Sequence, residues 1–290
     1  MNVFLNGEMM PIGVARVPVQ DRGFLFGDGV YEFLPVYSRR PFRLAEHLAR
    51  LKASLSALQI DNPHDDARWA AIIGQVIAAN PWEDQGVYLQ ITRGVAPRDH
   101  AFPKNIRPTV YVSASALVTP SREQVDNGVS AITHEDFRWL RCDIKTTALI
   151  ASCMLRELAV QSGCAETILL RQGMLTEASA SNVMVVQAGQ VLAPPKSRLM
   201  LAGITYDVVL ELMQASGVPH AVRQISEAEL RTADEIWLTS SSKEVLAVTR
   251  LDGSAVGHGA AAGRPGPVFR RVHALYQEFK STVMRSSVHV

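Results

Sequence analysis

A run of leucines at helical spacing is the clearest pattern in the chain. The apolar positions of this run recur at three- and four-residue steps: Leu44, Leu48, Leu51, Leu55 and Leu58. Such spacing predicts one buried face of an amphipathic helix over residues 43–58. A second helix is predicted over residues 65–79, and it stops at Asn80-Pro81 because proline disfavours helical geometry in the residue before it.

Short runs of apolar and β-branched residues predict strands around these two helices. In the first part of the chain the expected strands cover residues 3–5, 30–37, 87–92 and 109–116. Between the last two strands lies a loop, residues 94–107. It contains two prolines and several charged residues whose spacing matches neither a helix nor a strand. Functional residues are often carried on such loops.

The chain turns polar around Thr119-Pro120, which predicts a domain boundary. We expect a smaller N-terminal α/β domain in residues 1–120 and a larger C-terminal α/β domain in residues 121–290. The second part should contain helices over 144–161 and 204–214, strands over 166–170, 182–186, 235–238 and 245–249, and a last helix that ends near Lys280. This mixture of elements indicates the α/β (α+β) fold class.

Composition narrows the classes of function. A chain of 290 residues, 47% of them hydrophobic, can bury a real core. Its net charge of +1 argues against a nucleic-acid binder and favours a small-molecule partner. The three cysteines show no CxxC pair and no zinc spacing, so neither a disulfide framework nor a metal site is expected. The sequence shows no secretory leader pattern and no apolar run of about 20 residues, which predicts a cytoplasmic location without a membrane partner.

One lysine differs from the others by its context. The chain has six lysines against 23 arginines, and Lys145 stands directly before the apolar run of residues 148–158. It should lie where a loop or strand enters a helix at the edge of the core. Partial desolvation there favours the neutral amine, which is nucleophilic enough to form a Schiff base. The alternative is an ordinary surface lysine near the start of a helix.

A single acid, Glu177, lies among small residues between two predicted strands. A flat ligand could approach the backbone of such a segment closely. A carboxylate that faces a pyridine nitrogen keeps this nitrogen protonated, which lets the ring accept electrons. The alternative is that Glu177 begins a turn that serine and asparagine side chains cap.

Three further segments offer groups that suit a phosphate. The helix that begins at Ile204 and Thr205 presents free backbone N–H groups at its positive end. Ser240 and Ser241 follow an apolar strand and add small donors, and Arg50 on the first helix could add a bidentate charge. Each of these could equally be a helix cap, a turn or a solvated arginine.

The order of these pieces resembles that of the fold-type IV, or class IV, pyridoxal-phosphate aminotransferases. The resemblance begins with the segment DRGFLFGDGVYE at residues 21–32 and covers essentially the whole chain. Its further motifs lie in residues 46–51, in the lysine segment, at Thr176-Glu177, in residues 203–205 and in residues 239–241. It implies two α/β domains with pyridoxal 5'-phosphate between them, and at least a homodimer that builds each site with loops of a neighbouring subunit.

The resemblance also implies a role for individual residues. Lys145 would be the Schiff-base lysine and Glu177 the partner of the pyridine nitrogen. The implied phosphate ligands are Arg50, Ile204, Thr205 and Ser241. Two positions depart from the expected pattern: Ala180 stands where a third serine is expected, and Tyr206 stands where a basic residue is frequent. Both could alter the affinity for the cofactor or the range of substrates.

Residues 97–103 resemble the D-amino-acid branch of this family. In that branch an arginine and a histidine two residues apart join a tyrosine in binding the substrate carboxylate, here Arg98, His100 and Tyr31. In an extended loop, positions i and i+2 point to the same side, so both side chains can reach one anion. The implied reaction is ping-pong transamination between a D-amino acid, such as D-alanine or D-glutamate, and a 2-oxo acid.

Three alternatives remain open from the sequence. A branched-chain L-aminotransferase would share the cofactor residues but bind the carboxylate differently. An aminodeoxychorismate lyase has the same fold and would release an aromatic amine. A non-catalytic vitamin B6-binding protein is a third possibility, which intact Lys145 and Glu177 do not support.

Overall fold

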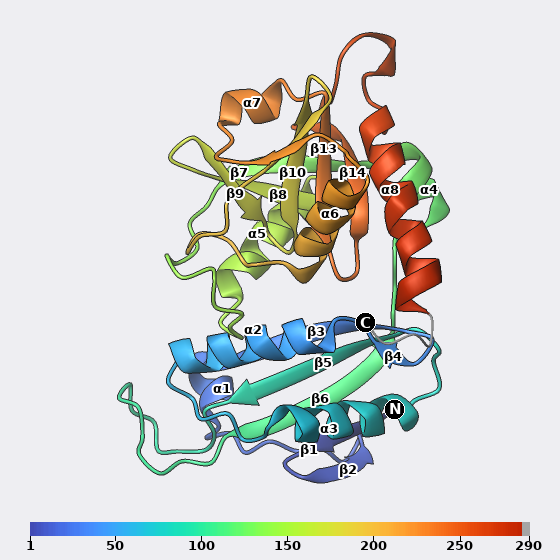
Figure 1. The fold of residues 1–290 in the computed structure, drawn as a ribbon. Coiled ribbons are helices and arrows are strands. Elements are labelled where there is room, and N and C mark those ends of the chain that lie inside the picture. The colour runs from blue at the N-terminus through green and yellow to red at the C-terminus, as the bar shows by residue number, and fades with distance from the viewer. Residues whose placement is uncertain (286–290) are drawn as a thin grey trace. The chain divides into compact units, whose positions relative to one another are not determined.

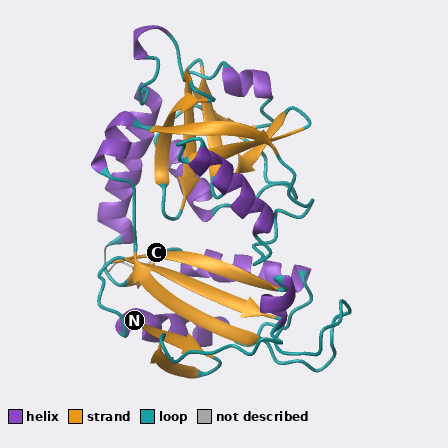
Figure 2. Ribbon diagram, turned by 180° about the vertical axis from the view of Figure 1, so that it is seen from behind, coloured by secondary structure: helices purple, strands orange, loops and turns teal. Residues whose placement is uncertain are grey.

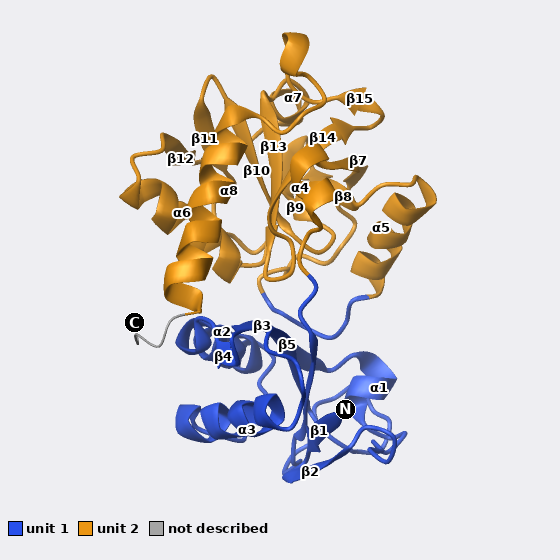
Figure 3. Ribbon diagram, turned by 90° about the vertical axis from the view of Figure 1, so that its right-hand side faces the viewer, with its two compact units in different colours: residues 1–118, 144–149 blue, residues 119–143, 150–290 orange. Residues whose placement is uncertain are grey.

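The computed structural model describes residues 1–285, which form two compact units (Figure 3). Unit 1 comprises residues 1–118 and 144–149, and unit 2 comprises residues 119–143 and the chain from residue 150 onward. The expected C-terminal domain included the lysine segment, but this segment belongs to unit 1. The physical reason is that Ile144 packs in the hydrophobic core of unit 1. The backbone of the following residues also pairs with a strand of the same unit.

Unit 1 is an antiparallel sheet covered by helices. Its elements are β1 (Asn2–Leu5), β2 (Glu8–Pro11), α1 (Arg22–Phe26), β3 (Gly29–Tyr37), β4 (Arg40–Pro41), α2 (Leu44–Ala57), α3 (Asp66–Ala78), β5 (Gln85–Thr92) and β6 (Thr109–Ala116). The six strands follow the order β2-β1-β6-β5-β3-β4, and every neighbouring pair is antiparallel. Helices α2 and α3 lie on one face of the sheet (Figures 1 and 2).

The core of unit 1 lies between this face and the two helices. Alternate residues of a strand point to opposite faces of a sheet. Val30, Leu34 and Val36 of β3 therefore face the helices, and all three are buried. The leucine face of α2 packs in the same core, which confirms the interpretation of the leucine run. Tyr31 and the residues of the same parity face the opposite side of the sheet.

Unit 2 is built on a larger mixed sheet. Its elements are α4 (Arg122–Asn127), β7 (Val129–Glu135), α5 (Ile150–Gln161), β8 (Glu166–Arg171), β9 (Met174–Ala178), β10 (Asn182–Gln187), β11 (Gln190–Ala193), α6 (Ile204–Ala215), β12 (His220–Val222), α7 (Glu227–Arg231), β13 (Glu235–Ser240), β14 (Glu244–Leu251), β15 (Ser254–Ala255), the 3-10 helix η1 (Gly259–Ala261), α8 (Pro267–Phe279) and the π-helical turn η2 (Lys280–Met284). The nine strands run in the order β12-β11-β10-β13-β14-β7-β8-β9, with β15 paired to β14.

The strands of this sheet pair in both directions. β11 with β12, β14 with β7, and β7 with β8 are parallel, and the other pairs are antiparallel. Ile168, Val183, Ile236 and Val248 come from four of the strands and pack in one hydrophobic core. Both units combine sheet and helix, which confirms the predicted α/β (α+β) class.

The prediction of a helix over residues 144–161 was only partly right, since the helix begins at Ile150. Residues 144–149 are held instead by hydrogen bonds to β3 and the residues before it. The hydroxyl of Thr146 donates to the carbonyl of Gly29 at 3.0 Å, and that of Thr147 donates to the carbonyl of Gly27 at 2.9 Å. These long-range bonds outweigh the local apolar pattern.

Candidate functional site

The lysine segment occupies a free edge of strand β3. Partner β4 pairs only with the far end of β3, at Val36 and Tyr37, so the beginning of β3 is open on that side. There the backbone N–H of Tyr31 donates to the carbonyl of Lys145 at 2.9 Å, and Val30 forms an antiparallel bridge with Thr146. Because side chains alternate along paired strands, Lys145 faces the same side of the sheet as Tyr31.

The side chains of Lys145 and Tyr31 are in contact. The Lys145 Nζ lies 4.1 Å from the centre of the Tyr31 ring, and both side chains are partly buried. Tyr88 of β5 lies beside Tyr31, with ring centres 5.5 Å apart. Burial, together with the neighbouring tyrosines, raises the pKa of Tyr88 to about 12. The structure therefore brings two predicted site residues together on an aromatic surface.

On the helix-covered face, Arg50 binds a carboxylate that the sequence analysis did not single out. Arg50 donates to both oxygens of Glu32 at 2.8 Å, and His47 Nδ1 lies 2.8 Å from Glu32 Oε2. Burial opposes the charge of Glu32, but the ion pair with Arg50 and the hydrogen bonds outweigh it and lower the pKa of Glu32 to about 2. Burial lowers the pKa of His47, although Glu32 acts in the opposite direction. Because an ionised carboxylate can only accept, His47 donates to Glu32 from Nδ1.

A sequence signal could have identified Glu32. It has the same strand parity as Val30 and Leu34, so a charged side chain at this position must enter the covered face of the sheet. A buried carboxylate requires a cationic or hydrogen-bonding partner. His47 and Arg50, three residues apart on α2, provide it because positions i and i+3 lie on one helix face. The role of Arg50 as a phosphate ligand stays a prediction.

Arg98 and His100 lie together on the loop between β5 and β6, which extends past the end of the sheet of unit 1 (Figure 1). Both side chains are exposed, and both lie near Phe26. The Phe26 ring centre is 5.5 Å from that of the His100 ring and 5.4 Å from Arg98 Cζ. Within residues 1–285 no hydrogen bond, ion pair or ring contact joins either residue to Tyr31 or Lys145.

In unit 2, Glu177 is a buried carboxylate on strand β9, only 4% exposed. One oxygen accepts a hydrogen bond from Arg138 at 2.6 Å. The other accepts from Asn182 Nδ2 at 3.3 Å and from the backbone N–H of Leu201 at 3.1 Å. Burial raises the pKa of Glu177 to about 7, although Arg138 acts in the opposite direction.

Arg138 does not fully neutralise Glu177 because it is shared with another carboxylate. Its Nε and NH2 donate to the two oxygens of Asp136 at 2.9 Å, and Arg171 lies 3.2 Å from Asp136. The result is a buried row of alternating charges that ends at Glu177. The sequence analysis missed Arg138, and no local pattern marks it, since its partner Glu177 lies 39 residues further on.

Two of the three predicted phosphate-binding segments, the start of α6 and the serines after β13, lie in unit 2, whereas Arg50 lies in unit 1. Helix α6 starts at Ile204 without a side-chain hydrogen bond at its cap residue, Gly203. A Cβ at Gly203 would lie 2.0 Å from Asn182 Oδ1, so this close approach requires glycine. Asn182 is the residue that donates to Glu177 and to the carbonyl of Leu201. Asn182 therefore contacts both Glu177 and the residues just before α6.

The serines of the predicted site end strand β13. Ser240 Oγ accepts from the backbone N–H of Lys243 at 3.0 Å, and Ser241 lies in the same turn. Thr239, just before them, is 1% exposed, and its hydroxyl has no hydrogen-bond partner among the described residues. It lies opposite Asn182 in the strand pairing. An unpartnered donor thus lies next to Asn182, on the same face of the sheet.

The two departures from the family pattern have different surroundings. Ala180 is exposed, whereas its neighbours Ser179 and Ser181 both donate to the buried carboxylate of Glu166. Tyr206 is 1% exposed, and its hydroxyl donates to the carbonyl of Pro194 at 2.8 Å. Burial raises the pKa of this hydroxyl to about 12. Tyr206 therefore points into the core of unit 2 and stabilises the fold there.

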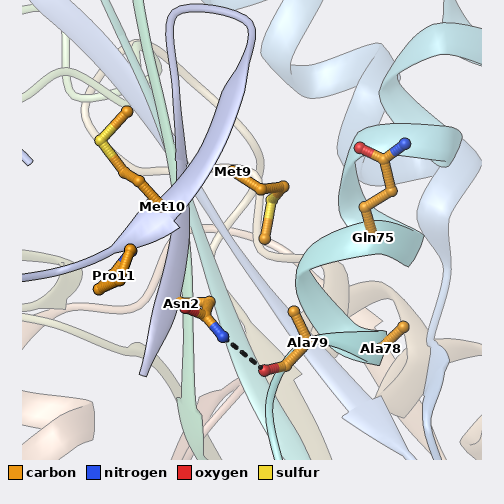
Figure 4. A pocket seen from close by; sticks show the side chains of 7 residues that line it. All are labelled: Asn2, Met9, Met10, Pro11, Gln75, Ala78 and Ala79. Carbon is orange, nitrogen blue, oxygen red and sulfur yellow. Dashed lines mark hydrogen bonds between the residues drawn. The ribbon is translucent and has the colours of Figure 1, made fainter.

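A shallow groove elsewhere in unit 1 does not involve the predicted site. It lies between β2 and the end of α3 (Figure 4), and its lining residues are Asn2, Met9, Met10, Pro11, Gln75, Ala78 and Ala79. No residue of the predicted site lines this groove. Among the helices of residues 1–285, none is long and apolar enough to span a membrane. The cytoplasmic location stays a prediction from the sequence.

Comparisons with known proteins bear on the family. The family model of class IV aminotransferases matches residues 29–251. The D-alanine aminotransferase of Bacillus licheniformis is 39% identical over 277 residues, which are 96% of each chain. That of Staphylococcus haemolyticus is 34% identical over 96% of this chain and 97% of its own.

Solved structures with similar folds carry a different name. The branched-chain amino acid aminotransferase of T.th. with pyridoxamine 5'-phosphate superimposes with a TM-score of 0.89 at 25% identity, over 99% of this chain and 95% of its own. That of Escherichia coli gives a TM-score of 0.88 at 24% identity, over 97% and 94%. These similarities confirm the predicted fold type IV.

Proposed function

The chain belongs to the class IV aminotransferases, and we propose that it transfers the amino group of a D-amino acid to a 2-oxo acid with pyridoxal 5'-phosphate as cofactor. The full-length similarity to D-alanine aminotransferases supports the choice of D-substrates. The observation that carries the proposal is the pair of exposed side chains of the β5–β6 loop, Arg98 and His100, which both lie against the ring of Phe26 in α1.

The residues of unit 2 fit the cofactor. Burial raises the pKa of the Glu177 carboxyl to about 7, so Arg138 compensates its charge only in part. A further cation, such as a protonated pyridine nitrogen, would stabilise the charged carboxylate. The unpartnered hydroxyl of Thr239 and the uncapped start of α6 offer donors of the kind that a phosphate accepts. We therefore assign Glu177 to the ring nitrogen, and Ile204, Thr205, Ser240 and Ser241 to the phosphate. Arg50, which binds Glu32 in unit 1, is assigned to the phosphate on the family resemblance alone.

Lys145 is assigned to covalent attachment of the cofactor and to proton transfer. Pyridoxal phosphate, when bound, supplies an electron sink that lets the α-carbon of the substrate release its proton. Lys145 Nζ would accept this proton as the general base and would deliver it, as the general acid, to a carbon other than the α-carbon, as transamination requires. The backbone pairing with β3 fixes Lys145 against Tyr31, so the tyrosine hydroxyl is available to the substrate carboxylate on the same side.

We also infer a homodimer. Arg98 and His100 are exposed and are not in contact with Tyr31 or Lys145 of their own chain, as far as residues 1–285 show. This geometry favours a loop that serves the site of a second copy. Closed two-fold pairing is the commonest way to place such a loop reciprocally.

A panel of D- and L-amino acids with pyruvate or 2-oxoglutarate as acceptor tests the proposal. We expect D-alanine or D-glutamate to react at least tenfold faster than its L-form, in line with charge-assisted hydrogen bonds worth about 1.5–3 kcal/mol each. A preference for L-leucine or L-valine would instead establish a branched-chain aminotransferase.

A further inference from the structure

The loop that carries Arg98 and His100 is anchored by a buried arginine of α1. Arg22 is 3% exposed, and its guanidinium donates to the backbone carbonyls of Asp99 and His100. Its Nε donates to Asp28 Oδ2 at 2.7 Å. A planar guanidinium can bind one carboxylate and two carbonyls in a fixed geometry, which a lysine ammonium cannot reproduce. One side chain therefore fixes the backbone between the two exposed residues.

Asp28 connects this arginine to a second one. Arg93 is also 3% exposed, and it donates to both oxygens of Asp28, at 2.8 and 3.0 Å. It further donates to the carbonyls of Leu58 and Gln59, and its guanidinium lies 3.6 Å from the centre of the Phe102 ring. This cation–π contact holds the far end of the loop segment. Through these two arginines, Asp28 links both ends of residues 99–102 to the body of unit 1.

Two further features restrict the loop. Phe26 contacts the side chains of Arg98 and His100, and its ring centre also lies 4.8 Å from Arg22 Cζ. At the neck of the loop, Gly94 has a φ of +106°, and a Cβ there would lie 2.1 Å from the carbonyl oxygen of Arg107. Only glycine fits this position. The loop is therefore closed at its neck and supported along its length.

We propose that Arg22, Phe26, Asp28 and Arg93, here named the loop platform, are positioning residues for recognition of the substrate carboxylate. This inference rests on the proposed function, in which Arg98 and His100 bind that carboxylate. Exposed side chains lose conformational freedom when they bind an anion, and fixing their backbone in advance reduces this loss. The platform would also give a role to the segment DRGFLFGDG, which contains three of its four residues.

The platform should act on substrate binding and not on proton transfer. In the part of the chain that the structure describes, no hydrogen bond, ion pair or ring contact joins its four residues to Lys145 or Tyr31. A loss of the platform should therefore raise KM for both substrates and leave kcat unchanged. A general loss of folding would lower the amount of active enzyme and so reduce the apparent kcat instead.

Arg22→Lys is the sharpest test because it keeps the positive charge beside Asp28 and removes only the planar guanidinium that binds the two carbonyls. We expect KM for D-alanine and for pyruvate to rise about tenfold each, the effect of one charge-assisted hydrogen bond. The kcat should stay within about twofold, and the absorbance of bound cofactor should be unchanged. Arg16→Lys is the matched control, since exposed Arg16 also donates to two carbonyls, those of Gly13 and Ala15. It should leave all constants unchanged.

A second variant and a double mutant complete the test. Phe26→Leu removes the ring beside His100 and leaves the hydrogen bonds of Arg22, Asp28 and Arg93 in place, and it should raise KM at least threefold even if Arg22→Lys does not fold. In an Arg98→Ala background, Arg22→Lys should raise KM by clearly less than the tenfold expected in the wild type, because only His100 then remains for the platform to position.

The outcomes separate the two proposals. If Arg98→Ala raises KM for D-alanine but Arg22→Lys and Phe26→Leu do not, the platform is refuted and the proposed function stands. An equal further rise of KM in the Arg98→Ala background would also overturn the platform. If Arg98→Ala itself leaves KM for D-alanine unchanged, the proposed carboxylate site fails first.

Discussion

Replacing Glu177 by glutamine tests the electrostatics of the cofactor site while the shape of the side chain hardly changes. Burial raises the pKa of Glu177 from its ordinary value of 4.5 to about 7, and Arg138 offsets this effect only in part. The offset is partial because Asp136 already binds two nitrogens of Arg138. Glutamine therefore removes a carboxylate that is unfavourable in the folded, cofactor-free protein.

The sign of the effect on stability follows from the direction of the shift. A carboxyl whose pKa is raised by folding binds its proton more tightly in the folded protein than in the unfolded chain. Raising the pH from about 4.5 to about 7 therefore destabilises the folded state, and the loss is complete above that range. At about 1.4 kcal/mol per pH unit, the shift from 4.5 to about 7 corresponds to roughly 3 kcal/mol.

Urea unfolding of cofactor-free protein at pH 5 and pH 8 measures this difference. Glu177→Gln should exceed the wild type in free energy of unfolding by about 3 kcal/mol at pH 8 and by less than about 1 kcal/mol at pH 5. Its turnover with cofactor should fall on the order of a hundredfold, since charge stabilisation is lost. The exposed Glu157→Gln is the control. If the free energy of unfolding of the wild type instead rises relative to that of Glu177→Gln between pH 5 and pH 8, the ion pair with Arg138 outweighs burial and the reasoning is wrong.

Three further predictions concern the assigned residues and the dimer. Lys145→Ala should abolish transamination and the visible absorbance of covalently bound cofactor; near-normal turnover without added amine would contradict the assignment. Arg98→Ala should raise KM for D-substrates about tenfold or more and leave cofactor binding intact, as measured by steady-state kinetics and cofactor titration. Mixed and reassociated Lys145→Ala and Arg98→Ala subunits should recover about a quarter of the wild-type activity at low substrate if the loop acts in the partner's site, and no more than the residual activity of the Arg98→Ala subunits if it acts in its own.

Elements with a strong local period were predictable from the sequence. The predicted helices over 43–58 and 65–79 are found at Leu44–Ala57 and Asp66–Ala78, because the apolar face of a helix is encoded by residues three and four positions apart. Strand β6 is found at its predicted bounds. In these segments tertiary packing agrees with the local preference.

Segments held by distant partners were not predictable. Residues 144–149 follow an apolar helical pattern, yet they pair with β3, more than a hundred residues earlier in the chain. Arg138 gains its importance only through Glu177 and Asp136. A single charged residue in a loop has many possible partners in sequence, and only the fold selects one of them. Family resemblance could propose site roles for Lys145 and Glu177, and these stay predictions, but the sequence could not identify the groups that contact the two side chains.

The enantiomer preference is a consequence of geometry and not of a separate specificity pocket. In the proposed mechanism Lys145 would reach the substrate from one side, and its backbone pairing with β3 keeps it against Tyr31. The hydrogen on the α-carbon must point toward Lys145 in every productive complex. With that bond fixed, the enantiomer is decided by which of two directions the carboxylate takes. Binding of the carboxylate by Arg98 and His100, as proposed, would leave the other direction for the substrate side chain, and the residues that bind the carboxylate would then also select the D-form.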